Sequence, residues 1–171
     1  MSDRNSVDRS LIRDVPKDIR PVDLDDVDRR ILAVLHADAR ISNSALADAV
    51  GIAPSTCHGR VRRLQDLGVI RGFYADIDPT AIGLPLQAMI AVRLQAAARG
   101  KIRGFVAQIR RRPQVIDVYF LAGADDFLIH VAARDTDDLR SFVVDNLNAD
   151  DDVAGTETSL IFEHLRGACP L

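Results

Sequence analysis

Three arginines occur within four positions of the segment GIAPSTCHGRVRRLQDLGVI, which spans residues 51–70. Guanidinium groups bind phosphate oxygens and guanine edges, and short hydroxyl side chains can reach base edges at close range. The residues of this region that could make such contacts are Pro54, Ser55, Thr56, His58, Arg60, Arg62, Arg63 and Arg71. Their types suit a surface that meets a polyanion such as double-stranded DNA.

The distribution of charge supports a separate basic unit. The formal net charge is −3 for the whole chain, but it is −3 over residues 1–28, +4 over residues 29–73 and −4 over residues 74–171. A basic segment between acidic ones is typical of a small nucleic-acid-binding domain joined to another domain. A solvated helix surface would produce the same pattern. The interpretation as a nucleic-acid-binding domain therefore depends on the predicted secondary structure as well.

Two amphipathic helices are predicted ahead of the arginines. The segment LDDVDRRILAVLHAD places Asp25 where it can cap the first helix, and ISNSALADAVG places Ser42 or Asn43 at the start and Gly51 at the end of the second. The side chains expected to face inward are Val27, Ile31, Val34 and Leu35 in the first helix and Leu46, Ala49 and Val50 in the second.

A third helix carries the arginines. Pro54 suits its first position and Gly68 ends it. Its apolar face is formed by Cys57, Val61, Leu64 and Leu67. Two short helices joined by a tight turn, the second with small polar residues at its N-terminus, form a helix-turn-helix. We therefore predict a DNA-binding domain over residues 23–68, preceded by an extension without an assigned role at residues 1–22.

Beyond Gly68 the pattern changes to alternation. The segment VIRGFYADIDP predicts a linker strand within residues 69–84, which could pair with its copy in a second chain. Over residues 85–166 the order is βαββαβ, with strands in LPLQAMIAVRLQ, VIDVYFLA, DFLIHVAAR and TETSLIFEHL and helices in GKIRGFVAQIRRRP and TDDLRSFVVDNL. That order predicts an α+β, ferredoxin-like domain with both helices on one face of an antiparallel sheet, followed by a tail at residues 167–171.

The uncovered face of such a sheet is expected to be partly apolar. Alternation places Asp117, Tyr119, Leu128 and His130 on one side and Val118, Phe120, Phe127, Ile129 and Val131 on the other. A mixed face suits contact between subunits, so we expect at least a homodimer. Its two-fold symmetry would set two recognition helices about one DNA turn apart on a pseudo-palindromic operator.

Composition argues against several other classes of protein. No apolar run approaches the roughly 18 residues that span a bilayer, and the N-terminus lacks the order of a secretory signal, so we expect a cytoplasmic protein without a membrane partner. Cys57 and Cys169 lack the spacing of a disulfide framework or a zinc site. No nucleophile elbow or glycine-rich phosphate loop occurs either, so we expect neither a metal nor a cofactor.

The loop AGADD is the second candidate site. A free α-amino acid presents a carboxylate and an ammonium group. Gly123 permits a positive φ at which successive amides converge on an anion, and Asp125 or Asp126 can pair with the ammonium, although a plain hairpin turn would use the same residues. The candidate effector-binding residues are Leu121, Ala122, Gly123, Ala124, Asp125 and Asp126, with Thr156 and Thr158 as hydroxyls of a second wall.

Three blocks together resemble the leucine-responsive and asparagine-C (Lrp/AsnC, feast/famine) family of transcription regulators. They are LDDVDRRIL, then ISNSALADAVGIAPSTCHGRVRRLQDLGVIRGFYADIDPTAIG, and later LAGADDFLIHV, so the resemblance covers residues 24–165. It implies a winged helix-turn-helix, a C-terminal domain that senses amino acids, and dimers that associate into octamers. It also implies a glycine-centred effector loop at Gly123 with a matching Asp126.

The chain departs from that family at the caps and in the loop. Ala53 stands where the family usually has a serine that caps the recognition helix. Ala122 replaces a common Thr or Ser, and Ala124 with Asp125 replaces an acidic-aromatic pair. The identity of the effector therefore stays open.

Two other functions stay open as well. The layout also resembles siroheme decarboxylase subunits, with Asp125 and Asp126 as an acid/base pair, but adjacent strand residues point to opposite faces. A ligand-binding assembly module without DNA function is favoured only if the arginine face is buried. Salt-dependent DNA binding separates the regulator from both, and absorbance of a copurified tetrapyrrole would favour the enzyme.

Overall fold

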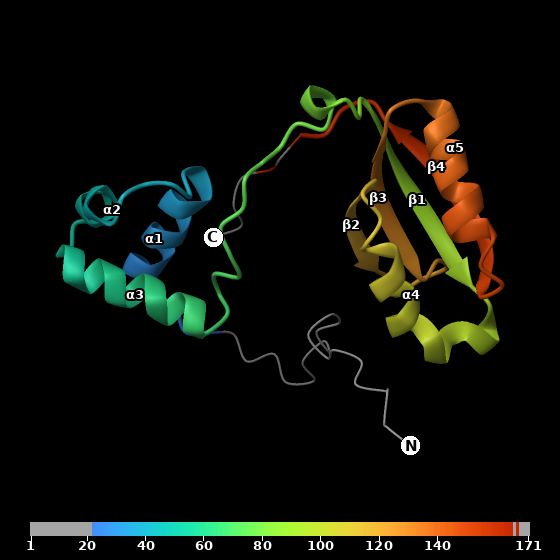
Figure 1. The fold of residues 1–171 in the computed structure, drawn as a ribbon. Helices are drawn as coiled ribbons and strands as arrows, with labels where there is room; N and C mark the ends of the chain where they lie inside the picture. The colour runs from blue at the N-terminus through green and yellow to red at the C-terminus, as the bar shows by residue number, and fades with distance from the viewer. Residues whose placement is uncertain (1–21, 166, 168–171) are drawn as a thin grey trace, which may run out of the picture. The chain divides into compact units, whose positions relative to one another are not determined.

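The computed structural model describes residues 22–165 and residue 167. The predicted extension and the predicted tail therefore lie almost entirely outside the described residues. The chain divides between Asp76 and Ile77 into two compact units. One is built from three helices and the other around a four-stranded sheet (Figure 1).

The helical unit consists of three helices, α1 (Asp26–Ala37), α2 (Asn43–Val50) and α3 (Pro54–Asp66). Asp25 caps α1 by accepting a hydrogen bond from the Asp28 amide at 2.8 Å, and Ser42 caps α2 by accepting one from the Ala45 amide at 3.2 Å. Gly51 ends α2 at a φ of +73°, a left-handed conformation that glycine adopts without the strain of a Cβ. The three predicted helices are confirmed.

The core of this unit differs from the prediction in α2. Its fully buried side chains are Ile31, Leu46, Ala47, Val50, Cys57 and Leu64. The expectation that Ala49 faces inward is wrong, because Ala49 is exposed and Ala47 is buried. The buried residues of α2 project within about 100° of one another at 3.6 residues per turn, and Ala49 lies outside that arc. Leu67, which was predicted on the apolar face of α3, is also exposed.

The segment after α3 forms no strand within one chain, and its predicted pairing with the copy in a second chain stays a prediction. Gly68 ends the helix as expected, with a φ of +70° and a hydrogen bond from the Val69 amide to the Leu64 carbonyl oxygen at 2.9 Å. Residues 69–85 form no strand, and Thr80–Ile82 form a 3-10 helix. A strand requires a hydrogen-bonded neighbour, and no other segment of the described chain pairs with this one.

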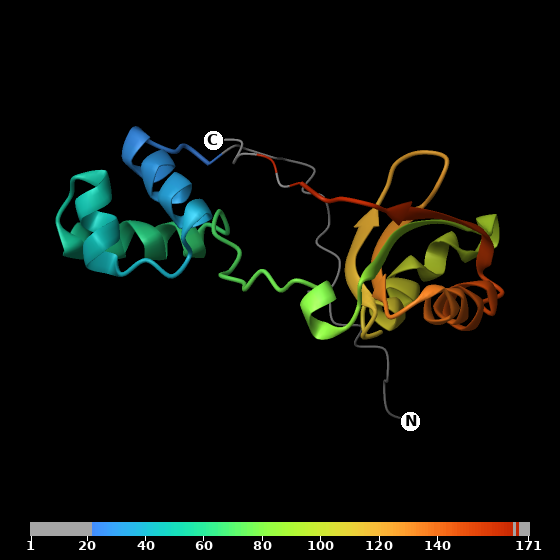
Figure 2. The same cartoon turned by 90° about the horizontal axis from the view of Figure 1, so that it is seen from above.

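The second unit has the predicted order βαββαβ. Its elements are β1 (Leu86–Leu94), α4 (Ile102–Ile109), β2 (Val115–Phe120), β3 (Phe127–Ala133), α5 (Thr136–Val143) and β4 (Val153–Ile161). A 3-10 helix, Ala96–Lys101, precedes α4, and a π-helical turn, Val144–Asn148, extends α5. The strands lie in the antiparallel order β2-β3-β1-β4, and both helices cover the same face (Figure 2). The ferredoxin-like fold is confirmed.

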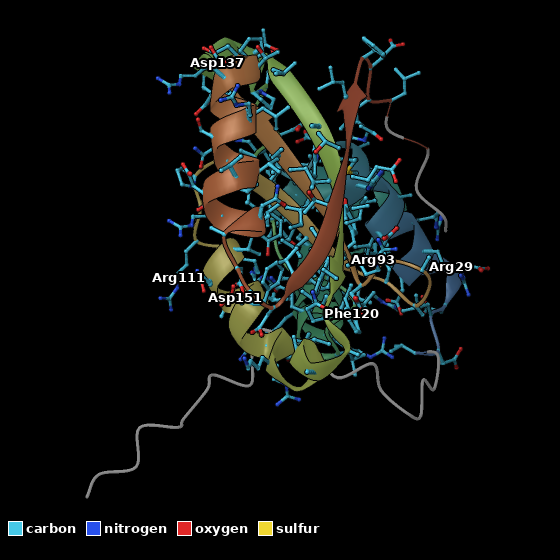
Figure 3. All side chains as sticks on the ribbon, turned by 90° about the vertical axis from the view of Figure 1, so that its right-hand side faces the viewer. Arg29, Arg93, Arg111, Phe120, Asp137 and Asp151 are labelled. Atoms are coloured by element: carbon cyan, nitrogen blue, oxygen red, sulfur yellow. The ribbon has the colours of Figure 1, made fainter. Side chains whose placement is uncertain are left out.

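The core of the sheet unit lies between the sheet and its two helices. Buried side chains there are Ala88, Ile90, Val92, Leu94, Ala98, Phe105, Val106, Ile109, Phe127, Ile129, Val131, Ala133, Leu139, Phe142 and Leu147. Asp135 caps α5 by accepting a hydrogen bond from the Asp138 amide at 2.8 Å. Asp137 lies in the first turn of α5 (Figure 3), where a negative charge is stabilised by the helix dipole.

The opposite face of the sheet is mixed, as the alternation predicts. The register places Asp117 beside His130 and Tyr119 beside Leu128. The His130 side chain is buried, and its Nε2 lies 3.0 Å from Gln87 Oε1. Burial lowers the pKa of His130, while the carboxylate of Asp117 acts in the opposite direction.

Candidate nucleic-acid interface and ligand-binding loop

The first turn of α3 is held by α2. Asn43 donates a hydrogen bond from Nδ2 to the Pro54 carbonyl oxygen at 2.8 Å. Ala53 occupies the N-cap position, and its methyl group makes no capping hydrogen bond. The polar side chains exposed on this turn and the next are Ser55, Thr56 and His58. The helix start therefore presents small polar groups from a position that a neighbouring helix fixes.

Two of the three clustered arginines are bound to acidic residues at the start of α1. Asp28, whose side chain is 1% exposed, accepts hydrogen bonds from Arg60 Nη1 on Oδ1 and from Arg63 Nη1 on Oδ2, each at 2.9 Å. Arg60 Nη1 also donates to Asp25 Oδ2 at 2.6 Å. The Asp28 amide and then Arg60 lower the pKa of Asp25, and Asp25 and Asp28 raise the pKa of Arg60. These ion pairs join α1 to α3.

Arg62 is placed differently from the other two arginines. It is exposed and forms no ion pair with a described residue. Ser55, Gly59 and Arg62 follow one another at helical spacing on one exposed face of α3. Arg71 is exposed in the segment beyond the helix. The outward face of α3 therefore carries Arg62, with the half-exposed Arg63 beside it.

The pairing of Arg60 and Arg63 is a feature that the sequence prediction missed. A signal was present, because Asp25 and Asp28 are three residues apart at a helix start and their side chains share a face. The neighbour of that face depends on tertiary packing, which the spacing does not reveal. The arginine face is not buried, so the assembly module without DNA function lacks the observation that would favour it.

Residues 121–126 connect β2 to β3 and project from the sheet (Figure 2). The Leu121 amide donates to the Asp126 carbonyl oxygen, and the Asp126 amide donates to the Val92 carbonyl oxygen, both at 2.9 Å. Asp126 Oδ2 accepts a hydrogen bond from the Leu94 amide at 2.8 Å. The carboxylate of Asp126 therefore fastens the loop to the end of β1. Ala122, Gly123 and Ala124 are exposed, and Asp125 is half-buried.

The prediction that Gly123 takes a positive φ is wrong. Within the described residues, positive φ occurs at Gly51, Gly68 and Gly83. The left-handed residue that an anion nest requires is therefore not formed at Gly123. A Cβ added at Gly123 would meet no heavy atom within 4 Å. Gly123 therefore contributes open space and not a special backbone conformation.

The structure does not bring Thr156 and Thr158 into a wall beside this loop. They lie on β4, opposite Val92 and Ile90 of β1, and the strand order puts β1 and β3 between β4 and β2. Thr156 Oγ1 donates a hydrogen bond to Asn148 Oδ1 at 3.1 Å. Because Asp126 bonds to Val92 and Leu94, strand β1 separates the base of the loop from Thr156, and the role of the two threonines stays a prediction.

Other kinds of site find little support in the described residues. No group of three or more His, Cys, Asp or Glu side chains that could hold a metal ion occurs in that part of the chain, and no helix there is long and apolar enough to cross a membrane. Cys57 is buried in the helical core, which raises the pKa of its thiol, and Cys169 lies outside the described residues. A hollow of about 400 Å³ with a mixed polar and apolar lining lies between α4 and β2 and is not lined by residues 121–126.

Known proteins resemble both units. Residues 24–71 match the winged helix-turn-helix DNA-binding family, and residues 87–168 match the Lrp/AsnC ligand binding domain. The chain is 79% identical over 155 residues to the HTH-type transcriptional regulator AldR of Mycobacterium tuberculosis, which covers 91% of this chain and 87% of the relative. It is 73% identical over 171 residues to AldR of Mycolicibacterium smegmatis, which covers 100% of each.

A solved structure extends the likeness to the fold. A transcriptional regulator of Neisseria meningitidis in complex with L-Met has a TM-score of 0.78 and 30% sequence identity, over 87% of this chain and 96% of that one. The named relatives are transcriptional regulators and not enzymes, which decides against the decarboxylase interpretation. With both halves matched, the chain belongs to the Lrp/AsnC family of DNA-binding transcriptional regulators.

Proposed function

We propose that α3 reads the major groove of a sequence-specific, pseudo-palindromic operator. The observation that carries this proposal is the exposed polar face of α3, on a helix whose other sides are held by α1 and α2. Ser55, Thr56 and His58 approach the base edges, and Arg62 contacts a guanine or a phosphate. Pro54, Arg60, Arg63 and Arg71 complete the surface.

We also propose that the sheet unit binds a small effector, an amino acid, through residues 121–126. The match to a ligand-binding domain and the L-Met complex of a similar regulator support this proposal. The Asp126 carboxylate is already engaged by the Leu94 amide, and Thr156 and Thr158 lie on the far edge strand. We therefore propose that another copy of the chain supplies the remaining contacts of the ligand.

A homodimer that assembles further into an octamer is the arrangement we propose for these copies. The open face of the sheet combines a partly apolar surface with Tyr119, which is 45% exposed, and the β2 edge carries Phe120, which is 60% exposed. Large apolar side chains grouped at one edge favour burial against another subunit. Dimerisation would also supply the two recognition helices that a palindrome requires.

Nuclease protection of the DNA upstream of its own gene, with and without each amino acid, tests these proposals together. We expect two protected half-sites separated by about one helical turn, and a pattern that changes with one or a few amino acids. Absence of any protected site would overturn operator binding. Protection that no amino acid changes would overturn the effector, and a monomer in sedimentation velocity would overturn the assembly.

A further inference from the structure

Asp28 is the one charged side chain of the described residues that is fully enclosed, and both of its oxygens are occupied by arginines of α3. Asp26, two positions earlier on the same helix, is exposed and makes no such contact. Burial of a carboxylate is unfavourable unless charged partners compensate for the lost hydration. The buried contact between α1 and α3 therefore depends on these two guanidinium groups. General acidity of the helix start would not require it.

The two arginines use the carboxylate in different ways. Arg60 directs one nitrogen at both Asp25 and Asp28, and its side chain is 29% exposed. Arg63 gives one nitrogen to Asp28, and its side chain is 50% exposed. A guanidinium group carries five N–H donors in a rigid plane, so fixing one edge also orients the other edge. The donors of Arg63 that Asp28 does not use belong to a half-exposed side chain, so they remain available to an outside phosphate.

We propose that Asp28 is a positioning residue for DNA binding, which orders Arg63 so that its outer donors meet a DNA phosphate. This inference rests on the proposed role of α3 as the recognition helix. A free arginine loses rotamer freedom when it binds, whereas an arginine ordered in advance has already lost that freedom. The Asp28–Arg63 pair therefore affects affinity for the operator, where the helix must sit at one position, more than affinity for DNA of any sequence.

If Asp28 acted only through its charge, its removal would change DNA affinity in the opposite direction. A negative charge near the DNA opposes binding, so its removal should tighten binding to every duplex. Positioning by Asp28 predicts instead that its removal weakens binding to the operator although the protein becomes more positive. The sign of the change therefore separates the two explanations.

Asp28→Asn and Asp26→Asn form a matched pair, because each removes one negative charge from the first turn of α1. Fluorescence anisotropy would measure the affinity of the full chain for the operator and for a scrambled duplex over a range of salt concentrations. We expect Asp26→Asn to keep the ratio of the two affinities, and Asp28→Asn to lower that ratio about tenfold or more. Equal ratios for the two variants would overturn the positioning role.

Arg63→Lys provides a second arm that does not depend on a substitution in the core. Lysine keeps the charge but lacks the fork that can hold Asp28 and a phosphate together. We expect the salt dependence to stay close to that of the parent while the preference for the operator falls. We also expect the double variant Asp28→Asn/Arg63→Lys to lose no more operator preference than the stronger single variant, because Asp28 is proposed to act on DNA binding through Arg63. Losses that add would overturn the proposal.

The same measurements distinguish this inference from the proposed function. Operator binding that is unchanged in Arg62→Ala and in Ser55→Ala/Thr56→Ala would overturn α3 as the recognition helix, and the role of Asp28 with it. Weaker operator binding in those variants, with Asp28→Asn behaving like Asp26→Asn, would overturn the role of Asp28 alone. Thermal unfolding of each variant shows whether a loss of operator preference occurs in folded protein.

Discussion

The surface of α3 and the loop over residues 121–126 are held in place by different kinds of contact. Side-chain ion pairs from α1 hold two arginines of α3, and Asn43 of α2 holds its first turn. The loop is held by backbone hydrogen bonds and by one carboxylate on the end of β1. The first arrangement fixes two side chains and the first turn of α3, whereas the second fixes only the backbone ends of the loop.

This difference bears on what each region can do within one chain. The polar face of α3 is complete as soon as its three helices pack, since its supports all come from the same unit. The loop has ordered ends, but its exposed middle meets neither Thr156 nor Thr158. We therefore expect DNA contact to need a second copy only for symmetry, and ligand contact to need one to complete the proposed site.

The largest effect is expected in the core of the sheet unit. Phe127 is fully buried between Phe105 and Phe120, with ring centroids at 5.3 and 5.4 Å. Phe127→Ala should lower the free energy of unfolding of this unit by about 3–5 kcal/mol, because a large cavity remains. Phe120→Ala, a change of the same type at an exposed position, should cost about 1 kcal/mol. Hydrogen exchange should show the loss of protection in β1 and β3 and unchanged protection in α3; loss in both units would contradict separate cores.

Arg62→Ala tests the DNA-binding side of the comparison. We expect DNA affinity to fall by about 1–3 kcal/mol if Arg62 reads a base, or the salt slope to fall by about one if it contacts a phosphate. The oligomeric state should not change. Arg140→Ala on α5 removes the same charge from the other unit and should leave affinity unchanged. Gel-shift titrations with equal affinities for parent and Arg62→Ala would contradict our assignment of α3.

The sequence predicted best what depends on local spacing. The cap at Asp25 and the stop at Gly51 follow from patterns within a few residues, and both are confirmed. The linker strand is not formed within one chain, because alternation alone does not supply a hydrogen-bonded neighbour. The pairing of Arg63 with Asp28 was missed because it joins residues 35 positions apart. In the candidate site, the sequence identified the types of residue, but the residues that they contact depend on tertiary packing.

Gly51 and Gly123 differ in why a glycine is present. The backbone angle of Gly51 favours glycine, whereas Gly123 only leaves open space. Gly51 has a φ of +73°, whereas Gly123 lies outside the positive range, and a Cβ at either position would meet no heavy atom within 4 Å. Gly51→Ala should therefore cost about 1–2 kcal/mol of stability through backbone strain. Gly123→Ala should change stability by about 0.5 kcal/mol or less. Chemical denaturation measures both values, and equal costs would contradict the backbone angle of Gly123.

Gly123 also separates folding from ligand response. Because Gly123→Thr is expected to fold normally, any loss of amino-acid binding in that variant would report on the space around the loop. Calorimetry of the parent and of Gly123→Thr with a panel of amino acids measures this. Equal heats from both would place the effector elsewhere.

The smallest effect is a difference in how the two units respond to acid. Burial places the pKa of His130 below its ordinary value of 6.5, so the unfolded chain binds this proton more readily than the folded one. The stability of the sheet unit should therefore fall as the pH falls through 6.5 toward the lower pKa of the folded state. The Asp117 carboxylate, which faces His130, reduces this loss, and His164 adds to it.

Asp25 of the helical unit acts in a different pH window. Its folded pKa lies below the ordinary 3.8, so its contribution is complete above that pH and is lost as the pH falls through the folded value. Hydrogen exchange at pH 7 and pH 5 should show weaker protection in β1 and β3 at the lower pH, with the contribution of Asp25 to α1 intact. His130→Gln retains a hydrogen-bonding group toward Gln87 but cannot titrate, so it should remove this pH dependence from the sheet unit. A variant that keeps the parent's dependence would show that another group in the sheet unit is responsible.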